Sequence, residues 1–523
     1  MGRAAIVRRS LGRYCVISFL EKAWLSCAET LMNMFKRGGG NGLKAAAVTF
    51  ESSPKLGVET DSATGVTTTQ IFGPLQTTVV LLNDGETSMC FISTACYADF
   101  YPYSNLLRER VGAILGLKRE QISVFSTHNH SCPVVTSWSL QLRTVIPQES
   151  VTLREDQLTD FGRIVLQQLQ RAARGLRERM VPVNIAWAVG RERRISYNRK
   201  GRRADGSTYF MRDEERVLLG ADFCGDIDDD APVVAFLGAN GKPVCFIVQF
   251  TAHPVTAYHP ESPVTFGDFA QVASDDLSLA HGGVPVLFLQ GCAGESNSKL
   301  FLLRIPAAER VANATRLGHQ LGETYIAAAG ALQSSKRSDL GFAWQSVFLP
   351  FTKVPSERRL RADLAVVEDF LKRVSAGDDQ LLTCLGINAA RSMSLTYRMK
   401  LVEPFRRWLH WALRFHTERR LQDAPKGVAV TIGAFRIGDI GFVGMPCEPL
   451  LGIGRQIRAG GNLSLTIPVG YMNDDIYYVP DAPNLGDFDY QSAYYRYTDA
   501  FLPFRKPGGD LLAKAGLRAL HRL

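Results

Sequence analysis

The stretch PVVAFLGANGKPVCFIVQFTAHP occupies residues 232–254 and has two apolar runs on either side of Asn240-Gly241. Asn-Gly favours the positive φ angles of a tight hairpin turn, and the flanking runs are rich in β-branched and aromatic residues. The stretch therefore predicts two antiparallel strands. The return strand, 243–251, runs directly into His253, so an imidazole is expected at the end of a buried strand.

Strand and helix signals continue on the N-terminal side of this hairpin. TTVVLLNDGETSMCFIS (77–93) is a second hairpin with an Asp-Gly turn. Apolar residues at helical spacing predict a helix at about 104–117, with Ser104 as a candidate N-cap. The next strand, 121–126, leads into STHNHSCP and therefore into His128.

On the C-terminal side the alternation continues around a more charged helical insertion at about 351–425. The expected elements are a buried-type strand in 284–297, a helix at 305–334, insertion helices at 355–374 and 401–421, two strands and a helix in 427–458, and a strand opening 463–480. This order indicates an α/β fold, a mixed β-sheet flanked by helices in a single large domain. No P-loop, GxGxxG or GxSxG motif is present, so nucleotide-binding and nucleophile-elbow functions lose their usual support.

The composition is that of an ordinary globular protein. The chain has 523 residues, of which 46% are hydrophobic and 21% charged, with a formal net charge of +9. Its arginines are scattered and accompany no nucleic-acid-binding motif, so we expect no nucleic-acid partner. The cluster RERRISYNRKGRR (191–203) is read as a solvated basic face, with an anionic substrate or membrane surface as the alternative.

Residues 1–43 are expected to form a basic, amphipathic extension that ends in the glycine-rich linker KRGGGNG (36–42), ahead of a main domain at 44–523. Glu21-Lys22 interrupts the leading apolar run, which is too short for a signal-peptide core, and no stretch is apolar enough to span a membrane. The ten cysteines form no CxxC pair, which suits a reducing compartment. A cytoplasmic location is therefore favoured.

Four strong strand signals each end near a residue that can bind a metal. These are His128 after 121–126, His253 after 243–251, Glu448 after 440–444, and a tyrosine near 477–478 after 463–468. Ligands of open α/β sheets gather beyond the carboxyl ends of the strands, and imidazole and carboxylate suit zinc. Taken singly, a histidine at a strand end is a hydrogen-bonded turn residue, and Glu448 is an acid favoured by a helix N-terminus. Because all four residues share this placement, a metal site is as well supported as these separate structural roles.

Several segments resemble motifs of the neutral/alkaline, non-lysosomal ceramidase family. STHNHSCP (126–133) resembles THTHSGP, FTAHPVT (250–256) the second histidine motif, FLQGCAGESN (288–297) QGxxGDxxP, GMPCEP (444–449) the PGE motif, and NDDIYYVPDAPNLGDFDYQSA (473–493) the segment of the last metal ligand. In that family a second site tyrosine follows the ligand tyrosine by twelve residues, and Tyr478 and Tyr490 have this spacing. The similarity spans about 44–500. Too few residues follow Thr498 for an immunoglobulin-like domain, so the catalytic domain alone is expected.

The resemblance implies one zinc ion (Zn2+) and a zinc-bound water as nucleophile. The implied ligands are His128, His253, Glu448 and Tyr478. His130 is expected to move a proton or hold the oxyanion, Tyr490 to hydrogen-bond the oxyanion, and Asn198 and Arg199 of SYNRK to bind the polar head of the substrate.

The chain departs from the family pattern at three positions. In VTFGDFAQ (264–271), Phe266 stands where the ceramidases have a serine, whereas Asp268 keeps the family's aspartate and is expected in the catalytic set. Thr265 would point away on a strand, so an acyl-enzyme route is disfavoured and a metal-hydroxide route survives. Cys447 replaces a glycine, and Glu295 replaces the aspartate of the QG motif.

The sequence therefore predicts a zinc-dependent amidohydrolase that cleaves the N-acyl amide bond of ceramide or of a related lipid or small-molecule amide. The alternatives are a hydrolase of a different amide or ester, and a non-catalytic ceramidase-like protein that binds a ligand or uses zinc structurally. VEPFRRWLHWALRFHTERRLQ (402–422) has Phe405, Trp408, Leu409, Ala412 and Phe415 at helical spacing. Docking of this face on the protein body is favoured over peripheral membrane contact.

Overall fold

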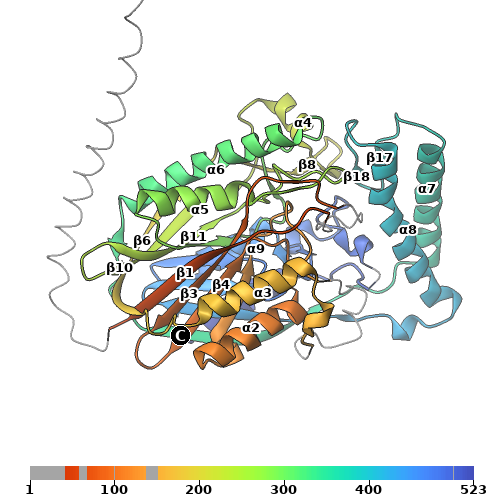
Figure 1. Ribbon diagram of the computed structural model, residues 1–523. Helices are drawn as coiled ribbons and strands as arrows, with labels where there is room; N and C mark the ends of the chain where they lie inside the picture. Colours follow the sequence, from red (N-terminus) through yellow and green to blue (C-terminus); the bar gives the residue numbers. More distant parts are fainter. Residues whose placement is uncertain (1–41, 58–66, 99, 137–150, 499) are drawn as a thin grey trace, which may run out of the picture.

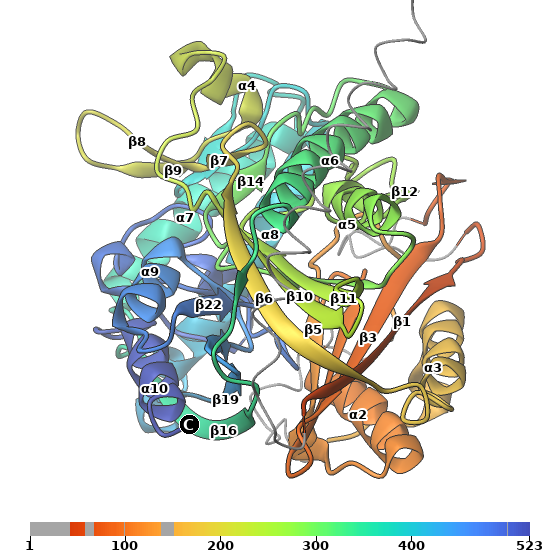
Figure 2. The same ribbon diagram turned by 90° about the vertical axis from the view of Figure 1, so that its left-hand side faces the viewer.

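The computed structural model describes residues 42–57, 67–98, 100–136, 151–498 and 500–523. Two β-sheets share one hydrophobic cluster between them, and helices cover their outer faces (Figures 1 and 2). The mixed α/β class and the flanking helices are confirmed. The strands, however, divide between two sheets, a separation that strand patterns cannot show because they do not specify which strands pair.

The first sheet has the order β13-β11-β10-β6-β1-β3-β4-β5, and β15 also pairs with β6. Its strands are β1 Lys44–Ser52, β3 Leu75–Asn83, β4 Ser88–Thr94, β5 Ile122–Ser126, β6 Val181–Arg191, β10 Asp230–Gly238, β11 Pro243–Phe250, β13 Val286–Gln290 and β15 Gln333–Ser334. The two predicted hairpins are confirmed as the antiparallel pairs β3–β4 and β10–β11. The outer strands β5 and β13 pair in parallel with β4 and β11, so the sheet is mixed.

The second sheet has the order β16-β19-β20-β22. Its strands are β16 Leu340–Pro350, β19 Gly427–Ile437, β20 Ile440–Gly444 and β22 Leu465–Val469. The remaining short strands are β2 Gln70–Ile71, β7 Ser196–Asn198, β8 Lys200–Arg202, β9 Thr208–Phe210, β12 Val264–Thr265, β14 Ser296–Ser298, β17 Thr383–Cys384, β18 Ile387–Asn388, β21 Glu448–Pro449 and β23 Tyr478–Val479.

Some helices of the described ranges cover the sheets on the sides that face away from the shared cluster, and others lie beyond the sheets. These helices are α2 Tyr101–Leu115, α3 Asp160–Ala173, α4 Asp213–Arg216, α5 Asp268–Ala280, α6 Ala307–Ala329, α7 Glu357–Ser375, α8 Leu395–Thr417, α9 Leu451–Gly460 and α10 Asp510–Leu520. Helices α2 and α3 share a hydrophobic cluster with β3, β4 and β5, and α5 and α6 share one with β10, β11 and β13. Helices α9 and α10 pack on the second sheet together with α7 and α8.

Aromatic packing joins the two sheets. Phe91 of β4 makes edge-to-face contacts with Phe125 of its own sheet, at 5.3 Å between ring centroids, and with Phe435 and Phe442 of the second sheet, at 5.2 and 6.1 Å. All four rings are buried. Such pairs add about 0.5–1.5 kcal/mol each beyond the burial of their area, so this cluster fixes how the sheets sit on one another.

Two predicted helix starts are wrong. Helix α2 begins at Tyr101 and not after Ser104, because Pro102 suits the first turn of a helix and places Ser104 inside it. The Ser104 hydroxyl donates instead to the carbonyl oxygens of Tyr101, at 3.2 Å, and Asn473. Helix α8 begins at Leu395, six residues before the predicted start, because the Ser394 side chain caps it.

The helix and linker predicted in residues 1–43 lie almost wholly outside the described residues. Strand β1 begins at Lys44. The division of the chain at this position stays a prediction. None of the helices in the described ranges has the length and apolar character needed to cross a bilayer.

The apolar face of α8 packs on the protein body. Phe405, Trp408, Leu409 and Ala412 are buried in the same cluster as residues of α7 and the second sheet. The indole N–H of Trp408 donates to the carbonyl of Phe501 at 2.8 Å. The face that suggested membrane contact therefore lies in the interior, and the outward face of the helix is rich in arginine.

Candidate metal centre and its cavity

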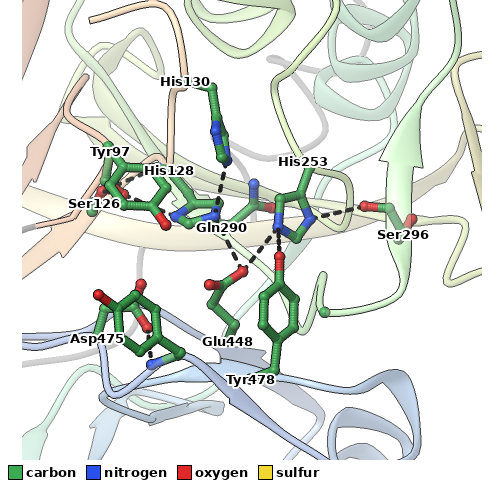
Figure 3. A network of polar contacts seen from close by, with 12 residues as sticks. Tyr97, Ser126, His128, His130, His253, Gln290, Ser296, Glu448, Asp475 and Tyr478 are labelled. Carbon is green, nitrogen blue, oxygen red and sulfur yellow. Dashed lines mark hydrogen bonds and ion pairs between the residues drawn. The ribbon is translucent and has the colours of Figure 1, made fainter. Parts of the chain in front are cut away.

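The predicted metal-binding residues face one another, and each lies C-terminal to a strand of one of the two sheets (Figure 3). His128 and His253 follow β5 and β11 of the first sheet. Glu448 and Tyr478 follow β20 and β22 of the second. The contact between the two sheets therefore brings together four segments that are far apart in the sequence.

His128 lies in the loop that follows β5 and not on the strand itself. Strand β5 ends at Ser126, and His128 has a φ of 61°. A left-handed conformation is unfavourable for a residue with a side chain. The Ser126 hydroxyl supports it by accepting the His128 N–H at 3.0 Å, and the Tyr97 carbonyl lies 2.9 Å from Nδ1. These contacts fix the direction of the imidazole.

His253 is fixed in the same manner. The carbonyl oxygen of Ser296 lies 2.9 Å from its backbone N and 3.1 Å from its Nδ1. The side-chain amide of Gln290, at the end of β13, donates to the carbonyls of Ala252, at 2.7 Å, and Thr127, at 3.3 Å. Those residues directly precede His253 and His128, so Gln290 ties the two histidine loops together.

Glu448 and Tyr478 are held side by side because β21 and β23 pair in parallel with these two residues in register. Glu448 Oε2 lies 2.9 Å from Nε2 of His253 and 3.2 Å from Nε2 of His128. The Tyr478 hydroxyl lies 3.2 Å from Nε2 of His253. Four donor atoms thus converge in the interior.

The donor set fits a metal ion. Because Nδ1 of His128 and of His253 faces a carbonyl oxygen, each Nδ1 carries the proton and each Nε2 presents a lone pair. Both lone pairs point at the same oxygen of Glu448, an arrangement that a cation between them would stabilise. Donor atoms bound at about 2.0–2.1 Å to a tetrahedral ion lie roughly 3.3 Å apart, close to the separations seen here. The second oxygen of Glu448 is buried and has no hydrogen-bond partner among the described residues.

Burial controls the charges of the cluster. Together with the positive charge of Arg199, it lowers the pKa of His128 to about 3 and that of His253 well below its usual value. Burial also raises the pKa of Glu448 to about 8, against the opposing effect of Arg199. The imidazoles are consequently neutral near pH 7, which is the form that binds metals.

His130 differs from the other two histidines because it is half-buried and faces a cavity. Its Nε2 lies 3.3 Å from Nε2 of His128. The ring nitrogens of His128, His130 and His253 lie within 4.8 Å of one another, so these three could also hold an ion. The structure therefore contains two overlapping donor sets that differ in whether His130 or the Glu448–Tyr478 pair completes the site.

The predicted substrate-binding pair is split. Arg199 is buried beside the cluster, and its guanidinium donates to the Tyr478 hydroxyl at 2.7 Å and to the Gly294 carbonyl at 2.7 Å. Asn198 points elsewhere: its side-chain amide donates to the carbonyl of Asp226 at 2.8 Å. On a strand neighbouring side chains point to opposite sides, so only one of this pair reaches the cluster.

Asp268 also lies apart from the donor atoms. It begins α5, and its carboxylate accepts the backbone N–H groups of Ala257, at 2.9 Å, and Phe269, at 2.7 Å. Burial raises its pKa to about 6. The contact with Ala257 holds the loop that follows His253, which is a positioning role. Phe266 packs in a small apolar cluster and supplies no nucleophile.

Glu295 and Cys447 are both buried near the cluster. Glu295 accepts the backbone N–H of Leu451 at 2.9 Å, at the start of α9, where a carboxylate is favoured. Burial raises the pKa of Glu295 to about 7. Cys447 directly precedes Glu448, and its carbonyl accepts the N–H of Tyr471 at 3.0 Å, so its backbone links Glu448 to the segment after β22.

We expect Glu295→Gln to become increasingly stabilising, relative to the wild type, as the pH rises from about 4.5 to 7. The unfolded carboxyl loses its proton near pH 4.5 whereas the folded one keeps it to about pH 7, so the wild type loses stability across this window. The total change should be about 2–3 kcal/mol. Urea unfolding of both proteins across this range measures it, with the exposed Glu368→Gln as control. A constant difference would contradict the burial argument.

A cavity of about 110 Å³ opens beside the cluster, or about 700 Å³ when the space open to solvent is included. His130, Arg199, Tyr478 and Tyr490 line its inner end. The Tyr490 ring lies 5.6 Å from that of Tyr478, and burial raises the pKa of its phenol. The remaining lining residues are Phe210, Arg212, Val255, Tyr258, Pro260, Asn297, Phe301, Ile387, Asn388, Met393, Tyr397 and Leu401.

Several contributors to this site were not predicted. Tyr97 packs on His128 at 4.6 Å, and Gln290 and Ser296 hold the histidine loops. Gln290 and Ser296 lie in FLQGCAGESN. The position of Gln290 at the end of a predicted strand could have indicated that it lies near the site. The cavity wall formed by residues 387–401 of the helical insertion left no pattern in the sequence.

No protein-family model and no curated protein matches the chain. Among solved structures, the crystal structure of the neutral ceramidase from Pseudomonas aeruginosa is similar, with a TM-score of 0.61, 17% identity, and coverage of 93% of this chain and 75% of that one. A structure described as ceramidase complexed with C2 has a TM-score of 0.59, 16% identity, and coverage of 92% and 74%. The chain is thus a mixed α/β protein with the fold of these ceramidases. Its buried histidine cluster has the donor atoms to hold a metal ion.

Proposed function

We propose that the protein is a zinc-dependent amidohydrolase that cleaves the N-acyl amide bond of ceramide or of a related lipid or small-molecule amide. The observation that carries the proposal is the convergence of His128, His253, Glu448 and Tyr478 beside a cavity that Tyr478 lines. We take these four residues as the ligands. The similarity to ceramidase structures supports the reaction class.

A bound zinc ion would supply a Lewis acid for the carbonyl and lower the pKa of a coordinated water. His130 faces the cavity with a ring nitrogen 3.3 Å from Nε2 of His128, which suits it to accept a proton from the nucleophile and return it to the leaving amine. Among the predicted catalytic residues, His130 therefore has the position of the general base.

Two further groups suit the negative charge that develops on the carbonyl oxygen. Tyr490 lines the cavity and packs against Tyr478, so its hydroxyl is placed to donate to an oxyanion. Arg199 donates to the Tyr478 hydroxyl and places a positive charge beside it, which partly offsets the burial that raises the pKa of this phenol. Asp268 supports the loop after His253 from behind.

A hydrolase of a different amide or ester is compatible with the same constellation. A non-catalytic protein that binds a ligand in the cavity is the second alternative. We expect about one zinc ion per chain by mass spectrometry of the purified protein, and hydrolysis of at least one member of a panel of fluorescent N-acyl-sphingosines, simpler N-acyl amides and matched esters. Stoichiometric metal without hydrolysis of any member would favour the binding protein, and absence of metal would contradict the proposed centre.

Peripheral membrane contact through α8 is tested separately. We expect Trp411→Glu to leave co-sedimentation with anionic liposomes unchanged, because the apolar face of α8 is buried and Trp411 packs against Trp408 and Phe415. If the wild type co-sedimented with the liposomes and Trp411→Glu did not, this helix would bind lipid.

A further inference from the structure

The cavity beside the candidate centre is lined by two arginines, and none of the described residues along its wall is an aspartate or glutamate. Arg199 and Arg212 both flank the ring of Phe210, with Cζ at 5.2 and 4.3 Å from the ring centroid. The cavity wall therefore has one arginine beside the candidate centre, Arg199, and a second, Arg212, farther from it.

The two arginines differ in how many of their donors are occupied. Arg199 uses its guanidinium on Gly294, Asn297 and Tyr478, all within 3.2 Å. Arg212 donates only from Nε and Nη2, to one carbonyl, that of Asn388, at 3.3 and 3.0 Å. Its Nη1 has no protein partner in the described part of the chain, so Arg212 retains capacity for a ligand.

No carboxylate in the described part of the chain pairs with the Arg212 guanidinium. The nearby acid Glu215 accepts the backbone N–H of Arg212 at 2.8 Å and the side-chain amide of Asn388 at 2.6 Å. Burial lowers the pKa of Arg212, which means that its positive charge is poorly solvated. Arginine nevertheless stays protonated in proteins, so an anion that enters the cavity would gain from pairing with it.

We propose that the substrate is an amide whose amine portion bears an anionic group, in the simplest case the carboxylate of an N-acyl amino acid, and that Arg212 binds this group. The proposal rests on the proposed function, since the amide bond has to sit at the candidate centre. The apolar remainder of the wall, with Val255, Phe301, Met393 and Leu401, suits the acyl chain. Arg212 then determines specificity and takes no part in bond cleavage.

The competing explanation is that Arg212 only joins the segment before α4 to the helical insertion through the carbonyl of Asn388. The test compares N-dodecanoylglycine with N-dodecanoylglycinamide, which differ only in the charge of the terminal group. The terminal groups are a carboxylate and an uncharged amide, and release of dodecanoate is followed so that only cleavage of the N-acyl bond counts. Both compounds are assayed with zinc-loaded wild type, Arg212→Gln and Arg212→Lys. Arg203→Gln, on the same segment but outside the cavity lining, is the control.

We expect the wild type to prefer the carboxylate substrate by about tenfold or more in kcat/KM, because a hydrogen bond to a charged group is worth about 1.5–3 kcal/mol. Arg212→Gln should lower kcat/KM for this substrate about 10- to 100-fold, mainly through KM, and leave the glycinamide unchanged. Arg212→Lys should retain part of the preference. Equal turnover of both substrates by the wild type, or equal losses on both in Arg212→Gln, would overturn the proposal.

The proposed function can fail without deciding this inference, so binding is measured as well. Calorimetric titration of the two compounds into the zinc-loaded wild type and Arg212→Gln reports the anion site even if neither compound is cleaved. Tighter binding of the carboxylate compound that disappears in Arg212→Gln would support the inference. Indistinguishable binding by the wild type would overturn it, whereas hydrolysis of neutral amides alone would leave the proposed function standing.

Discussion

His128→Ala is expected to purify without bound zinc and with kcat/KM lowered by about four orders of magnitude or more. The ring contributes one of the two imidazole nitrogens that face Glu448, at 3.2 Å, and its tautomer is fixed by the Tyr97 carbonyl. Without it the cluster loses a neutral donor that no neighbouring side chain can replace in the same orientation. Metal content by mass spectrometry and kcat/KM on the best amide of the panel measure the effect.

The His128 ring also packs between Tyr97 and Tyr471, at 4.6 and 4.2 Å, so its removal leaves a gap in the interior. His128→Gln fills more of that space and should lose metal equally, while circular dichroism and thermal unfolding check the fold. His319→Ala, at an exposed position on α6, is the matched control and should keep both metal and activity. A folded His128→Ala protein with stoichiometric zinc would contradict the assignment.

His130→Ala is expected to keep the metal and to lose about 10²- to 10⁴-fold in kcat, with little change in KM. The reason is its position: it is half-buried, lines the cavity, and has its Nε2 at 3.3 Å from Nε2 of His128. A group that moves a proton affects the chemical step, whereas a ligand affects metal retention. Zinc content and steady-state kinetics of the same preparation separate the two effects.

This variant also decides between the overlapping donor sets. If the three histidines held the ion, His130→Ala would lose it, and Glu448→Gln would retain it. If Glu448 is a ligand, Glu448→Gln loses affinity for zinc while His130→Ala does not. Loss of zinc in His130→Ala alone would reassign His130 from the proton-transfer role to the metal.

The sequence predicted which candidate residues follow buried strands because those signals are local. A hairpin turn such as Asn240-Gly241 depends on the φ preferences of two residues, and a histidine that follows a buried strand keeps its place whatever the strand pairs with. His253 and Glu448 are therefore at strand ends as expected. The predicted convergence needed only that these strands finish at the same end of the fold.

What the sequence could not predict depends on contacts between distant segments. The left-handed backbone at His128 is supported by Ser126 and by carbonyls from the segment after β4, so no local preference indicates it. Helix α5 begins at Asp268, whose carboxylate accepts the N–H groups of Ala257 and Phe269, and the contact with Ala257 joins segments that the sequence does not connect.

The second sheet and the cavity wall also depend on contacts between distant segments. The sequence of β19 would suit either a strand of the first sheet or a partner of β16. In the structure it pairs with β16, and Phe435 of β19 and Phe442 of β20 pack on Phe91 of the first sheet. The helical insertion was visible as charged helices, yet its contribution of Tyr397 and Asn388 to the cavity depends on docking.

The most direct test of the central claim is a crystal structure of the zinc-loaded protein with diffraction data on both sides of the zinc absorption edge. We predict a single anomalous peak within about 2.0–2.3 Å of Nε2 of His128, Nε2 of His253 and oxygens of Glu448 and Tyr478. His130 should lie outside that distance. A peak bonded to His130 in place of Glu448 and Tyr478, or no peak between the two sheets, would contradict the account.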